Sequence, residues 1–349
     1  MRRSFILFLL LQLFLACRTG RPEAVMAAGV SVEPVQKVAY RVPDAAKDRT
    51  ESWLFDVRIR EAQGRDVEPV GARVELLSAQ GEVLKTAELG SVGVKAITIS
   101  APRPLSTKAN PVLHGIRFKF TEPAGFPVDK VRCRIDLALA GGARVTRTVE
   151  VPVSSYQQKT ELIFPFRGPG IVMQGGFNDG GHRNRSGLFA IDALGLTESY
   201  APQVSSEDRN ESYAGWGREI LAPGDGVVTF ARNDVPENTV LDRDPDPQVY
   251  TMPDGMVADT GNSVVIDHQN GELSLVAHMQ QGSVRVRAGD RVTRGQVIGL
   301  LGNSGNSSGP HVHYQLMSGP DRQTADGLPV RFSNVRAQMM VRGTWFDAK

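Results

Sequence analysis

The stretch Gly302-Asn-Ser-Gly-Asn-Ser-Ser-Gly-Pro310 leads into His311-Val312-His313 and then Tyr314-Gln315-Leu316. A Gly/Ser/Asn loop and a proline, followed by Val, Tyr and Leu, predict a β-strand that begins near residue 311. Because strand side chains alternate between faces, His311 and His313 point the same way and could share one metal ion or one substrate. Imidazole is also the commonest protein ligand for metals such as zinc. The pair alone is equally compatible with two unrelated surface histidines.

Strand patterns also dominate the sequence that leads up to this pair, where Gly and Pro become frequent from about residue 158. The ranges predicted as strands are 187–194, 226–231, 263–267, 273–278 and 292–301. Asn270-Gly271 lies between two of them, and Asn-Gly between apolar runs is typical of a β-hairpin. The Asp- and Pro-rich segment 232–260 is too long for an ordinary loop in a compact domain, so we expect a lid or a rim there.

The sequence from about residue 30 to 155 also reads as short strands with alternating apolar and polar side chains. In Trp53-Leu-Phe-Asp-Val-Arg-Ile-Arg60, for example, Phe55, Val57 and Ile59 share one face. Several such strands separated by turns predict an immunoglobulin-like β-sandwich over 29–157, followed by a β-rich domain over 158–349 in an all-β chain. We expect the sandwich to act as a spacer or to bind a protein partner, and His114 within it to be structural.

The first 28 residues resemble an export signal. Arg2-Arg3 precede the apolar run 5–16, which is too short to span a bilayer. The run ends at Cys17 in a sequence similar to a bacterial lipobox, which predicts a lipid anchor at Cys17; the alternative is ordinary cleavage near residues 25–28. Either outcome places the protein in the cell envelope, the periplasm or the extracellular space, as a membrane-anchored lipoprotein or a released protein.

Composition excludes several classes of function. The net charge of +2 provides no strong attraction for nucleic acid or a membrane surface, so we expect no nucleic-acid partner. Beyond Cys17 the chain contains only Cys133, which excludes a disulfide framework and a cysteine-based zinc site.

Three further residues extend the histidine pair to a candidate site. Asp192 ends an apolar run, and a carboxylate buried there needs a cation or hydrogen-bond donors. His182 lies in the Gly-rich segment that precedes this run, and His278 ends the second strand of the predicted hairpin. One carboxylate and two imidazoles would leave the fourth position of a zinc ion open for a water molecule, as hydrolytic zinc sites require. The two remaining imidazoles could then move protons or stabilise an oxyanion.

At this point the chain resembles the lysostaphin/LytM-type zinc metallopeptidases, over roughly residues 165–335. The resemblance rests on five motifs in the family's order: Ala222-Pro-Gly-Asp-Gly-Val-Val, Gly261-Asn-Ser-Val-Val-Ile-Asp-His, Ala277-His278, Val292-Thr-Arg-Gly-Gln-Val-Ile-Gly299 and Ser307-Ser-Gly-Pro-His-Val-His313. It implies a duplicated-hybrid-motif-like fold and a zinc endopeptidase that cuts peptide cross-links of bacterial peptidoglycan. Matched by motif, it implies His182, Asp192 and His313 as ligands of one Zn²⁺ and His278 and His311 as catalytic residues.

One departure from the family pattern leaves alternatives open. Family members commonly space the first histidine and the aspartate four residues apart, whereas His182 and Asp192 are ten apart, and Asp179 could take the place of His182. The alternative function is a non-catalytic cell-wall-binding protein that activates other murein hydrolases. A third hypothesis is an enzyme gated by segment 232–260, in which deletion of the segment raises activity. We expect Asp267 to be structural, and His268, at the edge of the hairpin, to be a surface residue or a neighbour of the site rather than a ligand.

Overall fold

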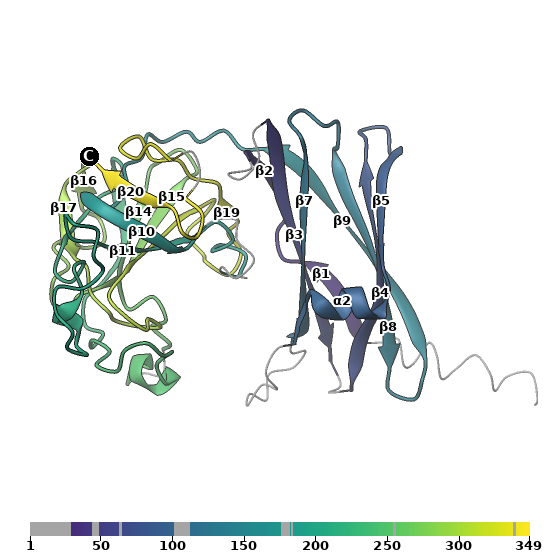
Figure 1. Ribbon diagram of the computed structural model, residues 1–349, viewed down its shortest axis with the longest axis horizontal. Coiled ribbons are helices and arrows are strands. Elements are labelled where there is room, and N and C mark those ends of the chain that lie inside the picture. The colour runs from purple at the N-terminus through teal and green to yellow at the C-terminus, as the bar shows by residue number, and fades with distance from the viewer. Residues whose placement is uncertain are drawn as a thin grey trace, which may run out of the picture. The chain divides into compact units, whose positions relative to one another are not determined.

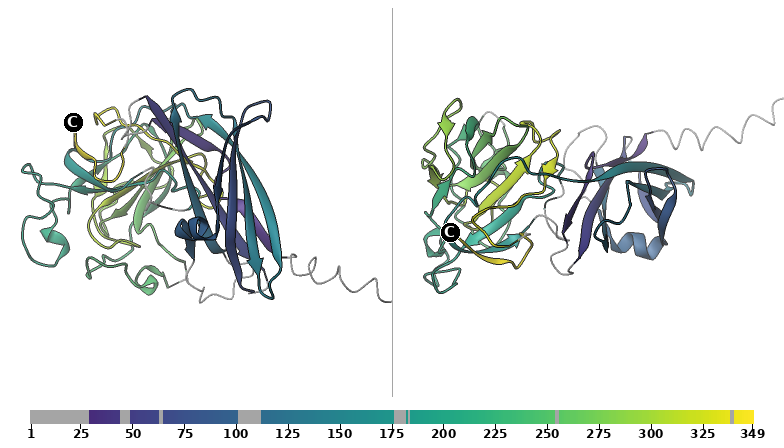
Figure 2. Two further views of the ribbon diagram at one scale, coloured as in Figure 1. Left: turned by 45° about the vertical axis from the view of Figure 1, so that its right-hand side comes forward. Right: turned by 90° about the horizontal axis from the view of Figure 1, so that it is seen from above.

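Strands are the main regular secondary structure of the computed structural model (Figure 1 and Figure 2), which describes residues 29–43, 49–62, 65–100, 112–175, 182, 184–253, 256–337 and 340–349. The prediction of an all-β chain is confirmed, since the α-helix of the described residues has only six residues. No helix in these ranges is long and apolar enough to cross a membrane. The predicted signal segment 1–28 with Cys17, and Asp179, lie outside the described residues.

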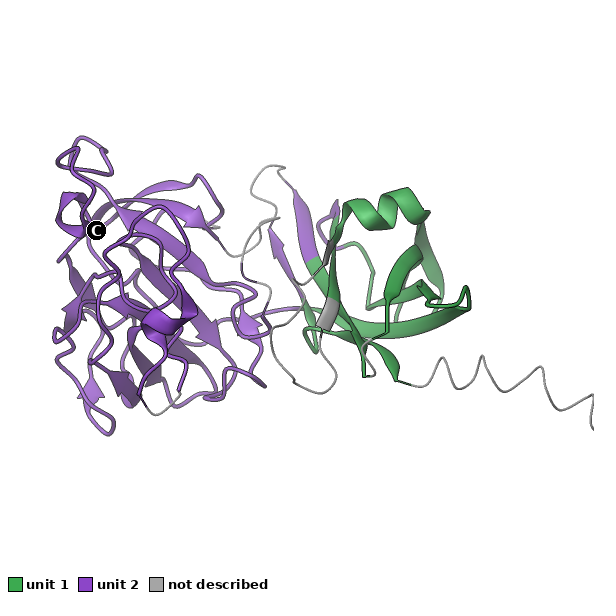
Figure 3. Cartoon of the chain, turned by 90° about the horizontal axis from the view of Figure 1, so that it is seen from below, with its two compact units in different colours: residues 1–39, 54–120, 126–154 green, residues 40–53, 121–125, 155–349 purple. Residues whose placement is uncertain are grey.

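The chain divides into two compact units (Figure 3). One comprises residues 1–39, 54–120 and 126–154, and the other comprises residues 40–53, 121–125 and 155–349. The domain bounds 29–157 and 158–349 stay predictions.

Nine strands of the first half of the chain form one sheet among the described residues. Their order is β5-β4-β8-β9-β2-β3-β7-β6, with β1 paired to β3, and helix α2 (Ser91–Ala96) follows β5. The strands are β1 (Val30–Pro34), β2 (Ala39–Pro43), β3 (Thr50–Glu61), β4 (Val67–Leu77), β5 (Val83–Leu89), β6 (Thr98–Ser100), β7 (Val112–Pro123), β8 (Lys130–Leu139) and β9 (Arg144–Ser155). The immunoglobulin-like arrangement of these strands stays a prediction.

Strand β3 shows both the use and the limit of the alternation rule. Phe55, Val57 and Ile59 are fully buried, as their shared face predicts. The other face is not simply polar and exposed to solvent, because Asp56 is buried there against Arg117. Arg117 Nη2 lies 2.6 Å from Asp56 Oδ2, and Arg117 Nε donates to Asp56 Oδ1 at 2.8 Å. A bidentate partner lets a carboxylate tolerate such burial. In the same unit Cys133 is a buried free cysteine.

The second half of the chain also forms a nine-stranded sheet, in the order β16-β13-β14-β15-β18-β11-β10-β20, with β19 paired to β18; β12 and β17 form a separate pair. The elements are β10 (Gly168–Gln174), β11 (Ile191–Gly195), η1 (Asn210–Ser212), β12 (Glu219–Leu221), β13 (Gly226–Arg232), η2 (Pro247–Tyr250), β14 (Asn262–Asp267), β15 (Leu273–Met279), β16 (Arg291–Val292), β17 (Val297–Leu300), β18 (Val312–Met317), β19 (Gly327–Leu328) and β20 (Trp345–Ala348). The hairpin predicted around Asn270-Gly271 is the antiparallel pair β14–β15.

Two predicted strands differ from the structure. The strand predicted over 187–194 begins only at Ile191, because the side chain of Asn184 accepts a hydrogen bond from the Gly187 N–H at 2.6 Å and closes a turn before it. The strand predicted over 292–301 is divided into β16 and β17 by a turn, in which the Gln296 N–H donates to the Thr293 carbonyl at 3.0 Å. Both errors arise because side-chain hydrogen bonds and tight turns override apolar periodicity.

An aromatic core fixes strand β18 in the middle of this sheet. Tyr314 is fully buried, and its ring packs edge-on against Phe332 with centroids 5.1 Å apart. Phe332 in turn packs against Phe164 at 5.1 Å, and Phe164 against Phe166 at 4.8 Å. Because neighbouring strand residues face opposite sides, the burial of Tyr314 directs His313 to the other side of the sheet.

Candidate metal centre

The register of three strands assembles the centre of the site. β18 lies between β15 and β11, and His313 is directly opposite both Ala277 on β15 and Asp192 on β11. Directly opposite residues of an antiparallel pair share a face with their Cβ atoms close together. The sheet therefore brings the Asp192 carboxylate against the His313 imidazole, although 121 residues separate them in the sequence.

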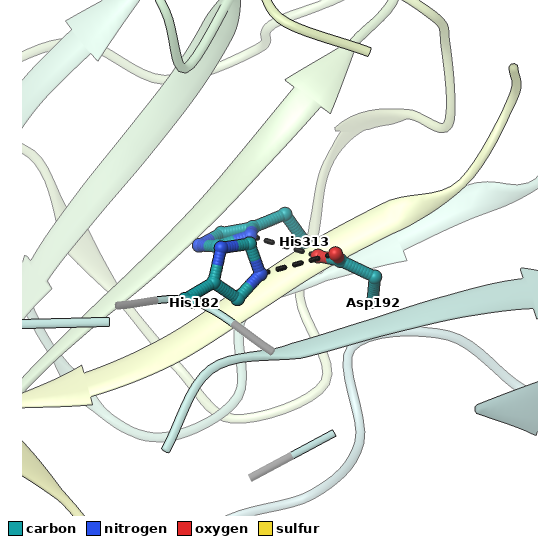
Figure 4. A group of neighbouring side chains, drawn as sticks. All are labelled: His182, Asp192 and His313. Atoms are coloured by element: carbon teal, nitrogen blue, oxygen red, sulfur yellow. Dashed lines mark hydrogen bonds and ion pairs between the residues drawn. The ribbon is translucent and has the colours of Figure 1, made fainter. Parts of the chain in front are cut away.

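Two imidazoles share the two carboxylate oxygens of Asp192 (Figure 4). His313 Nδ1 lies 2.8 Å from Oδ1, and His182 Nε2 lies 3.0 Å from Oδ2. One ligand atom from each of the three residues lies within 4.8 Å of the others. Asp192 and His313 are buried, whereas His182 is half-buried. The structure thus joins the three residues for which the sequence implied a metal-binding role.

The two other histidines of the predicted site lie beside this cluster. The His278 ring is 4.8 Å from that of His311 and 5.7 Å from that of His313, measured between centroids. His311 Nε2 lies 3.7 Å from Asp192 Oδ1. All five predicted site residues are therefore close together, and His311 and His313 lie on the same side, as their spacing predicted.

Hydrogen bonds decide which nitrogen each ring offers to the site. His278 Nδ1 lies 2.8 Å from the Ser304 carbonyl, and His311 Nδ1 lies 2.8 Å from the Gly309 carbonyl. A carbonyl can only accept, so each Nδ1 carries the proton and the Nε2 lone pair remains available. His313 is oriented the other way. Its Nε2 donates to Gln315 Oε1 at 3.0 Å, so the lone pair that remains available is on Nδ1.

Burial and neighbouring charges shift the pKa values of the site. Burial alone would raise the pKa of Asp192, but the neighbouring imidazoles of His182, His311 and His313 hold the pKa well below its usual value. Burial, aided by the other imidazoles, lowers the pKa of His278 well below its usual value. Burial also lowers the pKa of His313, against the pull of Asp192. The pKa of His311 is raised, because Asp192 and the Gly309 carbonyl outweigh burial.

These donors fit a divalent metal ion. In its neutral form, with the proton on Nε2, His313 directs the Nδ1 lone pair at a carboxylate oxygen 2.8 Å away, so two acceptors face each other. A cation between them removes this conflict, and His182 Nε2 supplies a third ligand atom. Two imidazole nitrogens and one carboxylate oxygen form a ligand set that zinc binds in hydrolytic sites.

Two features of the site were not predictable from residue spacing. His278 adopts a left-handed backbone conformation, with φ of +63°, which is uncommon for a residue other than glycine. The conformation is held by hydrogen bonds from the His278 N–H to the Thr260 carbonyl (3.0 Å) and from the Gly302 N–H to the His278 carbonyl (3.1 Å). The second feature is Gln315, two residues beyond the pair, which is buried and fixes the proton on His313.

His268 and His114, which the sequence did not assign to the site, have partners outside the cluster. His268 has Nδ1 2.7 Å from the Asp225 carbonyl and Nε2 2.8 Å from Ser274 Oγ. His114, in the other unit, has Nε2 2.6 Å from the Val67 carbonyl. Asp267 accepts a hydrogen bond from the Gln269 N–H at 2.7 Å in the β14–β15 turn.

Segment 232–260 is bonded to the loop that leads to His311. The Asn238 side chain donates to the carbonyls of Gly305 and Ser307, both at 2.8 Å, and Glu237 accepts from the Asn303 N–H at 2.7 Å. Ser307 Oγ in turn lies 3.1 Å from His311 Nδ1. The segment therefore braces the histidine loop.

Comparisons with known proteins find similarity to peptidases over part of the chain. The sequence model described as peptidase family M23 matches residues 212–326, a range that contains His278, His311 and His313 and begins after Asp192. The peptidoglycan DD-endopeptidase ShyA of Vibrio cholerae is 44% identical over 75 residues, or 20% of this chain. The DD-carboxypeptidase/endopeptidase Mpg of Neisseria meningitidis is 33% identical over 99 residues, or 28% of this chain. Each match spans 17% of the relative's length.

Among solved structures, the catalytic domain of lysostaphin from Staphylococcus simulans is 18% identical, with a TM-score of 0.26. The match covers 48% of this chain and 88% of that chain.

Proposed function

We propose that this chain, which contains a peptidase family M23 domain, is a zinc-dependent endopeptidase that hydrolyses peptide cross-links of bacterial peptidoglycan. The observation that carries the proposal is the cluster of His182, Asp192 and His313, in which His182 Nε2 and His313 Nδ1 lie 3.0 and 2.8 Å from the oxygens of one buried carboxylate. A buried carboxylate is costly unless it is paired with a cation or with donors, and a metal ion between these atoms would supply the cation.

His182 Nε2, the Asp192 carboxylate and His313 Nδ1 would hold the metal ion. Zinc bound there would supply Lewis acidity, which polarises a peptide carbonyl and makes water acidic enough to attack it near neutral pH. Gln315 keeps the proton of His313 on Nε2, so that Nδ1 stays free to bind. The buried Asp192 carboxylate stays ionised, because the surrounding imidazoles hold its pKa low.

His278 and His311 would handle the protons. Each is fixed by a hydrogen bond from Nδ1 to a backbone carbonyl, so the Nε2 lone pair of each ring stays available. One Nε2 accepts the proton of the attacking water, and a protonated imidazole donates to the oxyanion or to the leaving amine. The ring separation of 4.8 Å allows both to act on one scissile amide.

Two relatives support peptidoglycan as the substrate. One has a name that describes it as a peptidoglycan DD-endopeptidase, and the other is named a DD-carboxypeptidase/endopeptidase. We extend a D,D-peptide substrate from them to this chain. We also propose export to the cell envelope through residues 1–28, with a lipid anchor at Cys17, and a protein partner for the N-terminal strands.

The test is a digest of purified sacculi by the purified protein, with mass spectrometry of the products. We expect cross-linked dimers to be converted to monomers, a chelator to stop the conversion, and added zinc to restore it. A non-catalytic activator would leave the sacculi intact alone and act only with a second murein hydrolase. That outcome would overturn the proposal. The presence of all five site residues argues against a non-catalytic activator.

A further inference from the structure

A cavity of about 280 Å³ adjoins the candidate metal centre. Its lining includes Asp192 and His311 from the centre itself and three polar residues that the proposed mechanism does not use, Tyr213, Asp242 and Arg342. Because it opens onto the reacting groups, a peptide bound for hydrolysis would fill it. The charges of the lining residues therefore bear on which peptides fit.

Backbone hydrogen bonds attach the residues that follow Arg342 to strand β10. The Gly343 N–H donates to the Val172 carbonyl at 2.8 Å, and the Val172 N–H donates to the Thr344 carbonyl at 3.0 Å. Val172 on β10 is paired with Ala193, the neighbour of Asp192 on β11. The turn that contains Arg342 is thus tied directly to the strands that position the centre.

Asp242 is the second charged residue of the lining outside the centre, and it is already engaged. Its N–H donates to the Ser308 carbonyl at 2.8 Å, and its Oδ1 accepts from the Tyr213 hydroxyl at 3.2 Å. Asp192 is engaged as well, by the three histidines. Arg342, by contrast, makes no ion pair and no side-chain hydrogen bond to any described residue, so its five N–H donors are available to a ligand.

We propose that Arg342 binds a free carboxylate of the peptide substrate beside the bond that is cut, so that peptides bearing this carboxylate are the preferred substrates. This inference rests on the proposed function. A guanidinium matches a carboxylate in bidentate geometry, and carboxylates are the anions that a peptide carries. Asp242 would repel the same group, so the carboxylate is expected on the Arg342 side of the cavity.

The experiment compares two synthetic D,D-linked peptides on the zinc-loaded full chain. They are identical except that the residue supplying the scissile nitrogen has a free carboxylate in one and a carboxamide in the other. We expect kcat/KM of the wild type to be about tenfold higher for the carboxylate. Arg342→Gln should bring the ratio close to one, mainly through KM, and Arg342→Lys should keep part of it.

Arg291→Gln is the matched control, because Arg291 is an exposed arginine of β16 that does not line the cavity; it should keep the wild-type ratio. A wild type without preference, or an Arg342→Gln variant that retains it, would overturn the inference. If the wild type cleaves neither peptide, the proposed function fails instead. Calorimetric binding of the two uncleaved peptides then tests the subsite alone, and equal affinities would contradict it.

Discussion

The orientation of single imidazole rings determines what each histidine can do. His311 is held through Nδ1 and presents Nε2, whereas His313 is held through Nε2 and presents Nδ1 to Asp192. Two histidines on one strand face are therefore not equivalent. The division follows from the acceptor that each ring finds, the Gly309 carbonyl for one and Gln315 for the other.

The first prediction separates metal binding from chemistry. His313→Ala is expected to lose bound zinc and activity together, because it removes a ligand atom. His311→Ala should keep about one zinc per chain and lose about 10²–10⁴-fold in kcat, the usual contribution of proton transfer. Metal content and sacculus cleavage measured on the same preparations check this. The control variant His268→Gln lies outside the cluster and should change neither the zinc content nor the activity. Loss of zinc in His311→Ala would contradict the assignment of separate roles to His311 and His313.

Gln315 provides a second prediction at this scale. Gln315→Leu keeps the size of a buried side chain but removes the acceptor that fixes the proton of His313. Loss of such an outer hydrogen bond is expected to weaken zinc binding about 10–100-fold. Competition with a chromophoric chelator measures the affinity. The exposed Gln323→Leu serves as control, and an unchanged affinity in Gln315→Leu would show that Gln315 does not orient the ligand.

The sequence allowed the five site residues to be named, because strand alternation and ordered motifs depend on spacing alone. It did not indicate the left-handed backbone of His278 or the contact of Gln315, since both depend on partners from other parts of the chain, such as Thr260 and Gly302. Residue type and spacing carry no information about such partners.

At the scale of elements, β18 is the organising strand, since it pairs with the strands that carry Asp192 and His278. The alternation of its side chains and the β14–β15 hairpin were predictable. The turn before Ile191 was not predictable, because it depends on one hydrogen bond that the Gly187 N–H donates to the side chain of Asn184.

Segment 232–260 gives a third prediction. Since Asn238 and Glu237 bond the loop that leads to His311, deletion of the segment is expected to lower activity, in contrast to the gating hypothesis. The milder variant Asn238→Ala should reduce kcat about tenfold, because it releases two carbonyls of that loop, and should leave zinc content unchanged. Asp244→Ala, an exposed change in the same segment, is the control. Higher activity in either altered form would support gating.

Glu272 gives a fourth prediction, on stability. This fully buried carboxylate accepts from the N–H groups of Lys159 and Thr160 at 2.7 and 2.8 Å and from the Tyr156 hydroxyl. Burial opposes ionisation, but these hydrogen bonds lower the pKa of Glu272 below its ordinary value of 4.5.

A carboxylate with a lowered folded-state pKa stabilises the fold above its unfolded pKa, and this contribution is lost as the pH falls through the folded pKa. We therefore expect Glu272→Gln to cost about 1–3 kcal/mol at pH 7 and progressively less below about pH 4. Denaturant unfolding at several pH values measures this. The exposed Glu219→Gln should cost little at any pH, and a pH-independent cost for Glu272→Gln would contradict the assignment.

At the scale of the whole molecule, all five site residues lie in the unit that contains 155–349. The all-β class followed from alternation along most of the chain. Because His182 and Asp192 are ten residues apart, the sequence did not decide whether His182 or Asp179 is the first ligand. The structure brings His182 Nε2 to 3.0 Å from Asp192 Oδ2. Tertiary folding, rather than local spacing, thus determines the composition of this cluster.

The central claim is that one metal ion is bound by His182, Asp192 and His313. Crystals of the zinc-loaded full chain, measured on both sides of the zinc absorption edge, test it most directly. We predict one anomalous peak per chain, about 2 Å from His182 Nε2, from the Asp192 carboxylate and from His313 Nδ1. A cluster without a peak, or a peak bound by His278 or His311 in place of these ligands, would contradict the claim.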